Sequence, residues 1–187
     1  MSGAQVQHIF ISPVARGPML AADEVKAIAG RGLEGDRYFK GEGTFSPKAG
    51  RSGEITLIEM ESILAVRVDA KIHLLPSEPR RNLVTCGIRL NDLVGRMFCV
   101  GDVVLCGLKL CNPCDHLELL TQTGLKQALA NRGGLRAEIV RGGMIRLRDH
   151  ISVITAEKTQ AAAAGHEHAT EYGSGGEFGR IISLLSA

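Results

Sequence analysis

The stretch RMFCVGDVVLCGLKL, residues 96–110, has the pattern of a β-hairpin. Two segments rich in Val, Leu, Phe and Cys flank Val100-Gly101-Asp102-Val103, and a Gly-Asp pair favours a tight turn. Residues on both sides of the turn alternate in character, as they do in half-buried strands. We therefore predict two antiparallel strands joined at Gly101-Asp102.

Short segments of similar character recur along the chain. Each is rich in Val, Ile, Leu, Phe or Thr, and Gly, Asp, Asn or Pro separates many of them. The predicted strands are VQHIFIS (6–12), ITLIEM (55–60), RNLVTC (81–86), AEIV (137–140) and HISVIT (150–155). The stretch MIRLRDHISV, residues 144–153, predicts a second hairpin with Arg148-Asp149 in its turn.

Helical patterns are fewer. Residues 59–70 predict a helix behind an acidic first turn, with one face formed by Ile63, Leu64, Val66 and Val68. Residues 123–134 predict another, capped by Thr123 and ended by Gly133-Gly134, with a face of Leu125, Ala128 and Leu129. DHLELL, residues 115–120, predicts a short helical segment. Many strands with few helices predict a mainly β, barrel-like domain; neither G-x-G-x-x-G nor a P-loop occurs.

Composition narrows the function classes. A chain of 187 residues suits one domain, predicted as 1–155, and an Ala-, Gly- and Ser-rich tail, 156–187, whose IISLL end could bind the domain or a partner. A net charge of +2 and 4% aromatic residues argue against nucleic-acid binding. The sequence shows neither a membrane span nor a secretory signal, and its five cysteines are an odd number. Free thiols in a cytoplasmic protein are therefore expected.

The stretch LCNPCDHLE, residues 110–118, leaves several functions open for Cys111 and Cys114. The pair could form a redox disulfide, contribute to a zinc site with His116, or pack as small core residues. Core packing is the prediction for Cys111 and for three cysteines in strand patterns, Cys86, Cys99 and Cys106. Cys114 differs because Pro113 ends the strand before it and Asp115 can cap the following turn. A thiol there meets the positive end of a helix, which favours the reactive thiolate.

Arginine and glycine gather on segments that flank the cysteines. Arg80, Arg81 and Asn82 precede one strand, and Arg132, Gly133, Gly134 and Arg136 precede another. Paired glycines let a ligand approach the backbone, and guanidinium groups suit phosphate. Asp36 and Arg37, in a glycine-rich loop, are further candidate anchors or a structural ion pair.

Several of these segments are similar to the MOSC domain family, named for the C-terminal domain of molybdenum-cofactor sulfurases. They are GLEGDRY, GTFSPK, ITLIE, RRNLVTCGIRLNDLVGRMFCVGDVVL, CNPCDHLE, RGGLRAEIVRGG and IRLRDHI, spread over residues 5–155. The resemblance, to stand-alone bacterial members, implies a β-barrel-like MOSC fold. It also implies a cysteine that binds the molybdenum of a pterin cofactor or carries sulfur to it.

Aligned on the cysteine motif, the resemblance gives Cys114 as the molybdenum ligand, with Cys111 beside it. The family's R-P-N segment, near the pterin phosphate, is matched by Arg80-Arg81-Asn82, where Arg81 replaces proline. The other residues predicted to bind the cofactor are Arg132, Gly133, Gly134, Arg136, Asp36 and Arg37.

The resemblance leaves three functions open. One is an oxidoreductase that reduces small N-hydroxylated substrates with electrons from a separate protein. The second is a sulfur transferase that carries a persulfide on Cys114, supplied by a separate cysteine desulfurase, with no pyridoxal phosphate on this chain. The third is a non-catalytic interaction module that binds a partner through its tail. Whether the chain forms a homodimer is also open.

Overall fold

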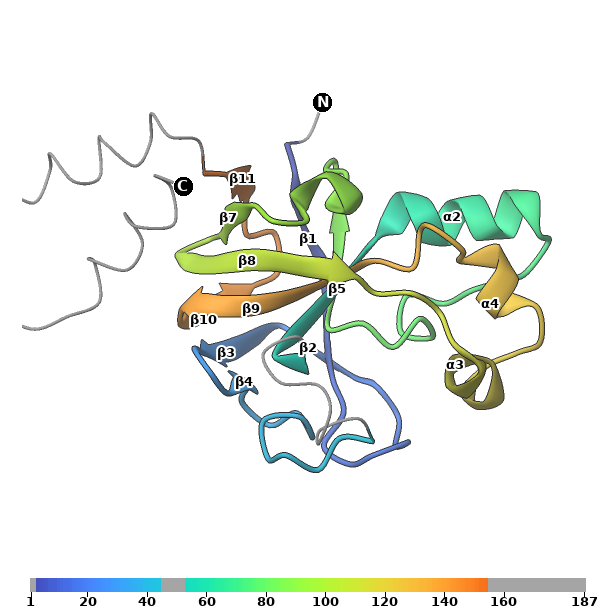
Figure 1. Cartoon of the computed structure of the whole chain (residues 1–187), viewed down its shortest axis with the longest axis horizontal. Coiled ribbons are helices and arrows are strands. Elements are labelled where there is room, and N and C mark those ends of the chain that lie inside the picture. Colours follow the sequence, from blue (N-terminus) through green and yellow to red (C-terminus); the bar gives the residue numbers. More distant parts are fainter. Residues whose placement is uncertain (1–2, 45–52, 155–187) are drawn as a thin grey trace, which may run out of the picture. The chain divides into compact units, whose positions relative to one another are not determined.

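The computed structural model describes residues 3–44 and 53–154 (Figure 1). Its helices are α2 (Met60–Asp69), α3 (Asp115–Leu120) and α4 (Leu125–Ala128), with a 3-10 turn η2 (Leu90–Leu93). Its strands are β1 (Gln5–Ile11), β2 (Leu20–Ala22), β3 (Glu24–Ile28), β4 (Gly32–Leu33), β5 (Ile55–Glu59), β6 (Leu83–Cys86), β7 (Met97–Val100), β8 (Val103–Leu110), β9 (Leu135–Arg141), β10 (Gly143–Arg146) and β11 (Ile151–Val153). The prediction of a mainly β domain with a few helices is confirmed.

An eight-stranded sheet in the order β11-β7-β8-β9-β5-β6-β1-β2 forms the body of the domain, beside a three-stranded sheet, β10-β3-β4. Neighbouring strands are antiparallel except for β5 and β6, which are parallel. The large sheet is open: no ladder of backbone hydrogen bonds joins its two end strands, β11 and β2, into a closed barrel. The start of β1 nevertheless reaches the β11 end of the sheet, because Val6 N donates to Asp149 O at 3.0 Å and Ile151 N donates to Ala4 O at 2.8 Å.

Two clusters of buried side chains hold the domain together. The larger one packs Leu57, Phe98, Leu105, Leu135 and Ile145 with their neighbours inside the sheets. The smaller one packs apolar side chains of the helices and their ends against two side chains of the sheet. The helical residues are Ile63, Val66, Leu117, Leu125 and Leu129, and the strand residues are Ile58 and Val84. Strand β5 serves both clusters, since adjacent residues of a strand point to opposite faces. The helices therefore gather at one end of the sheet, as Figure 1 shows.

The hairpin predicted over residues 96–110 is confirmed as β7 and β8, with Val100 opposite Val103 and Gly101 at φ 56°. The second predicted hairpin, over residues 144–153, is wrong. Its strands lie in different sheets: β10 pairs with β3, and β11 pairs with β7. The chain between them turns at Arg148, whose backbone N donates to Val6 O at 2.9 Å. Pairing with distant strands has overridden the local turn pattern.

The predicted helix over residues 59–70 is confirmed as α2, but its predicted face is only half right. Ile63 and Val66 are buried, whereas Leu64 and Val68 are 54% and 67% exposed. The helix predicted from Thr123 shortens to α4, because Gly124 precedes it in a left-handed conformation at φ 87° and Thr123 caps nothing. Its predicted apolar face of Leu125, Ala128 and Leu129 is buried.

The tail from residue 156 and part of the glycine-rich loop, residues 45–52, lie outside the described residues. Over residues 3–44 and 53–154, no helix is long and apolar enough to cross a lipid bilayer.

Candidate functional site

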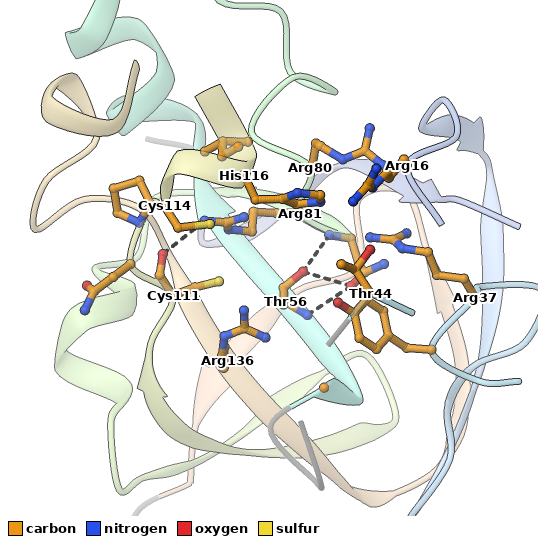
Figure 2. A pocket seen from close by; sticks show the side chains of 16 residues that line it. Arg16, Arg37, Thr44, Thr56, Arg80, Arg81, Cys111, Cys114, His116 and Arg136 are labelled. Carbon is orange, nitrogen blue, oxygen red and sulfur yellow. Dashed lines mark hydrogen bonds between the residues drawn. The ribbon is translucent and has the colours of Figure 1, made fainter. Parts of the chain in front are cut away.

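One pocket collects most of the predicted site residues where four loops meet the first residues of β5, β6 and β9 (Figure 2). No Asp or Glu is among its described lining residues. The lining residues are Arg16, Arg37, Tyr38, Thr44, Gly53, Thr56, Arg80, Arg81, Asn82, Cys111, Asn112, Pro113, Cys114, His116, Leu117 and Arg136. Five guanidinium groups thus surround one pocket, which favours an anionic ligand.

Cys114 is exposed, whereas Cys111 is 1% exposed, and both line the pocket. Cys114 stands immediately before α3, and its carbonyl accepts a hydrogen bond from Leu117 N at 2.9 Å. The prediction that Asp115 caps this helix is wrong, because Asp115 pairs instead with Lys126 at 2.6 Å. The structure therefore presents Cys114 to a ligand and packs Cys111 into the protein.

Two other interpretations of the cysteine pair find no support in the described residues. Strand β8, which precedes Cys111, is antiparallel to both of its neighbours, so the β-α-β setting of a thioredoxin-type pair is missing there. No group of three His, Cys, Asp or Glu side chains in the described ranges could hold a metal ion. The pair thus lacks the companion ligands that a structural zinc site needs.

Arg81 is buried and binds the protein backbone. Its Nε donates to Gly133 O at 2.9 Å, its Nη1 to Pro79 O at 2.8 Å and its Nη2 to Cys111 O at 3.0 Å. These bonds join three chain segments, so Arg81 holds the loop that carries the cysteines. All three nitrogens of its guanidinium group are therefore hydrogen-bonded to the protein's own backbone.

Asp36, which is buried, and Asn82, which is half-buried, belong to one hydrogen-bond network at the pocket. Asp36 is 3% exposed; its Oδ2 accepts from Ser12 N at 2.9 Å, and its Oδ1 accepts from Tyr38 N at 2.9 Å. It also pairs with Arg37 at 3.4 Å, which agrees with the structural ion pair considered from sequence. Asn82 Oδ1 accepts from the Oγ1 of Thr56 at 2.8 Å. Both residues position the pocket's walls.

At one end of the pocket the side chains of Arg16, Arg37 and Arg80 converge (Figure 2). The Nη2 of Arg80 donates to Gly17 O at 2.8 Å. Burial lowers the pKa of Arg80, and the positive charge of Arg37 lowers it further. This end of the pocket is therefore strongly positive.

His116 adds a titratable group to the pocket, and its pKa is lowered from its ordinary value of 6.5. Burial is the largest cause, followed by the charges of Arg16, Arg80 and Arg37. From sequence, His116 was considered only as a zinc ligand, and Arg16 was not singled out. Pro13 and Gly17 around Arg16 are turn signals, but they do not reveal which pocket a turn will face.

We expect an NMR titration of His116 to show a midpoint below 6.5, and Arg80→Gln to raise it. Between the lowered pKa and 6.5 the unfolded chain binds a proton that the folded chain does not. The free energy of unfolding should therefore fall as pH is lowered through this range. Arg132→Gln, outside the pocket, should leave the midpoint unchanged; an equal shift in both variants would contradict the proposed electrostatic cause.

The structure does not bring every predicted residue to the pocket. Arg132 lies outside its lining and binds Asp69 Oδ2 and Ala128 O, each at 2.7 Å. Gly133 and Gly134 are not among its lining residues either. A Cβ on Gly133 would lie 2.5 Å from Cys111 O, and one on Gly134 would lie 2.0 Å from Leu57 O. These glycines let backbone segments approach each other, and Arg136 is the residue of this stretch that lines the pocket.

Cys86, Cys99 and Cys106 lie in β6, β7 and β8 as their strand patterns predicted, but each is only half-buried. The prediction of core packing is therefore wrong for these three and confirmed for Cys111. Burial raises the pKa of the Cys106 thiol, and the nearby Glu138 raises it further. None of the three lines the pocket. Cys114 is therefore the exposed thiol of the pocket.

Comparison with solved structures relates this fold to several bacterial proteins. The YuaD protein from Bacillus subtilis matches with a TM-score of 0.68 and 18% identity, over 80% of this chain and 94% of that one. YiiM from Geobacillus stearothermophilus matches with a TM-score of 0.64 and 12% identity, over 81% and 75%. YiiM from Escherichia coli matches with a TM-score of 0.58 and 18% identity, over 98% and 85%. Neither a family model nor a curated protein matches the sequence. The chain shares the fold of YuaD and YiiM.

Proposed function

We propose that the chain is a MOSC-domain protein that binds a molybdenum–pterin cofactor in the arginine-lined pocket, with the Cys114 thiolate as a molybdenum ligand. The observation that carries this proposal is that one exposed cysteine and five arginines open onto the same pocket. Thiolate suits a soft metal, and guanidinium suits phosphate. The sequence resemblance over residues 5–155 and the fold shared with YuaD and YiiM support it.

The chemistry of the side chains fits such a cofactor. Because the described residues offer no group of three metal-binding side chains, a metal at Cys114 needs most of its ligands from a non-protein group. The sulfur atoms of a pterin dithiolene would supply them. Arg80 and Arg136 would hold the cofactor's anionic groups, while Arg81 keeps the cysteine loop in place. The bound cofactor would supply redox chemistry, such as reduction of N-hydroxylated compounds with electrons from a separate protein.

Expression in a host that makes the cofactor tests this proposal. Wild-type protein should carry molybdenum and a pterin, measured by elemental analysis and by fluorescence of the oxidised pterin. Cys114→Ala should lose most of the molybdenum, because a thiolate ligand is removed. Cys99→Ala, which changes a half-buried cysteine outside the pocket, should keep it. Full molybdenum content in Cys114→Ala would show that Cys114 is not the ligand.

The exposure of Cys114 also favours a second function, that of a sulfur carrier. The Cys114 thiolate would attack the outer sulfur of a desulfurase persulfide, forming a persulfide on Cys114 and releasing the desulfurase thiolate. Pyridoxal phosphate would belong to that separate enzyme. An intact mass increased by about 32 Da in the wild type and unchanged in Cys114→Ala would support the carrier. A bound molybdenum pterin in the same preparation would support the first function.

A further inference from the structure

Two apolar side chains of α2 are left outside the core. Leu64 is 54% exposed and Val68 is 67% exposed, although Ile63 and Val66 of the same helix are buried. Leu64 and Val68 are four residues apart, so they are neighbours on one face of the helix. Figure 1 shows α2 along one edge of the domain. Nothing among the described residues covers this apolar pair.

The same face of α2 has a small residue at its middle and a groove along its flank. Ala65 is half-exposed and lies three residues before Val68, which puts it on the same side of the helix. A groove of about 430 Å³ separates Glu61 and Ala65 from residues 87–89, the turn after β6. Small side chains and grooves are what allow two helices to pack closely. A second helix can therefore approach this face.

Opposite charges stand at the two ends of the face. Glu61 lies in the first turn of α2, and its Oε1 accepts the backbone N–H of Gly87 at 2.8 Å. Lys71 follows the last turn and is exposed, and within residues 3–44 and 53–154 it has no ion-pair partner. A helix that is negative at its start and positive at its end complements a copy of itself that runs in the opposite direction.

A two-fold axis level with position 66 satisfies the apolar and the charge pattern together. It places Leu64 opposite Val68 of the second copy, because these two residues are equally far from position 66. It also places Glu61 opposite Lys71 of the second copy, for the same reason. Parallel helices would instead bring each charge against its own kind, and like charges repel. The pattern therefore favours an antiparallel pair of α2 helices.

We propose that a second copy of this chain docks on this face of α2, antiparallel about a two-fold axis, with Leu64 and Val68 in the contact. Glu61 and Lys71 pair at both ends of it. A two-fold contact uses the same surface on both copies, as this one does. A helix of 10 residues is about 15 Å long, so the face is smaller than the roughly 800 Å² per partner of a standard interface. The dimer is therefore weak and depends on protein concentration.

Sedimentation equilibrium of the full chain tests the proposal, at low ionic strength and up to millimolar concentration. A reductant prevents disulfides through the exposed Cys114. The wild type should dimerise as its concentration rises. Leu64→Asp should weaken dimerisation about tenfold or more, because it puts a carboxylate into an apolar contact.

Leu119→Asp is the matched control for this variant. It makes the same change on a leucine of α3 that is 83% exposed, and it should leave the dimerisation constant unchanged. The proposal is overturned if the wild type stays monomeric, or if Leu64→Asp dimerises as tightly as the wild type. Equal weakening by the two aspartate variants would likewise overturn it.

Exchange of charges tests the antiparallel direction. Glu61→Lys and Lys71→Glu should each dimerise severalfold more weakly than the wild type, because each leaves like charges facing each other at both ends. A mixture of the two variants should associate more tightly than either variant alone, since the mixed dimer regains both ion pairs. A mixture no tighter than its components, or single variants as tight as the wild type, would rule out this arrangement. No residue of α2 lines the arginine-lined pocket, so these results do not depend on cofactor binding.

Discussion

Replacing Arg81 by methionine should destabilise the domain by about 3 kcal/mol or more, because buried acceptors left without donors each cost about 1–3 kcal/mol. Methionine keeps the length of the side chain but donates no hydrogen bond. It would leave Pro79 O, Cys111 O and Gly133 O without the guanidinium donors that they have now. Urea unfolding followed by circular dichroism should show a lower midpoint with an unchanged slope.

Arg132→Met is a matched control for this loss. Arg132 also binds a backbone carbonyl and pairs with Asp69, but its side chain is 30% exposed. Water can replace its partners, so this variant should lose about 1 kcal/mol or less. Arg81→Lys should be intermediate, because one ammonium cannot reproduce a fork spread over three chain segments. Equal losses for the two methionine variants would show that the bonds of Arg81 do not hold the cysteine loop.

Local chemistry explains why some elements were predictable. The hairpin of β7 and β8 depends on its own turn residues and alternation, so residues 96–110 suffice to predict it. The failed hairpin over residues 144–153 shows the limit of that argument. Its turn residues are suitable, but β3 and β7 offer better partners to β10 and β11. Strand partners far away in sequence cannot be identified from turn chemistry.

The candidate site likewise contains residues that the sequence predicts and residues whose role depends on distant parts of the chain. Cys114, Arg80, Arg37 and Arg136 were expected from residue type and neighbourhood, and the structure brings them to one pocket. Arg81 was expected at a phosphate, but its partners are three backbone carbonyls that no sequence pattern announces. The roles that were missed are those that depend on distant backbone groups.

Replacing Gly134 by alanine should destabilise the domain by about 3 kcal/mol or more, or prevent folding, because strain and overlap with backbone act together. Gly134 has φ 102°, a conformation that side chains with a Cβ rarely adopt. The added Cβ would lie 2.0 Å from Leu57 O, a backbone atom of β5 that cannot rotate away. Strands β5 and β9 would have to separate at the pairing of Leu57 with Leu135. Thermal and urea unfolding measure the loss.

Gly95→Ala isolates the overlap from the conformational strain. Gly95 also has positive φ, 76°, but nothing lies within 4 Å of the position that an added Cβ would take, so this variant should lose only about 1 kcal/mol. The difference between the two variants is then the cost of separating β5 from β9. That separation would also disturb the pocket, because Gly134 O accepts the backbone N–H of Cys111 and Thr56 on β5 binds Asn82. If Gly134→Ala is no less stable than Gly95→Ala, the close contact of these strands does not support the pocket.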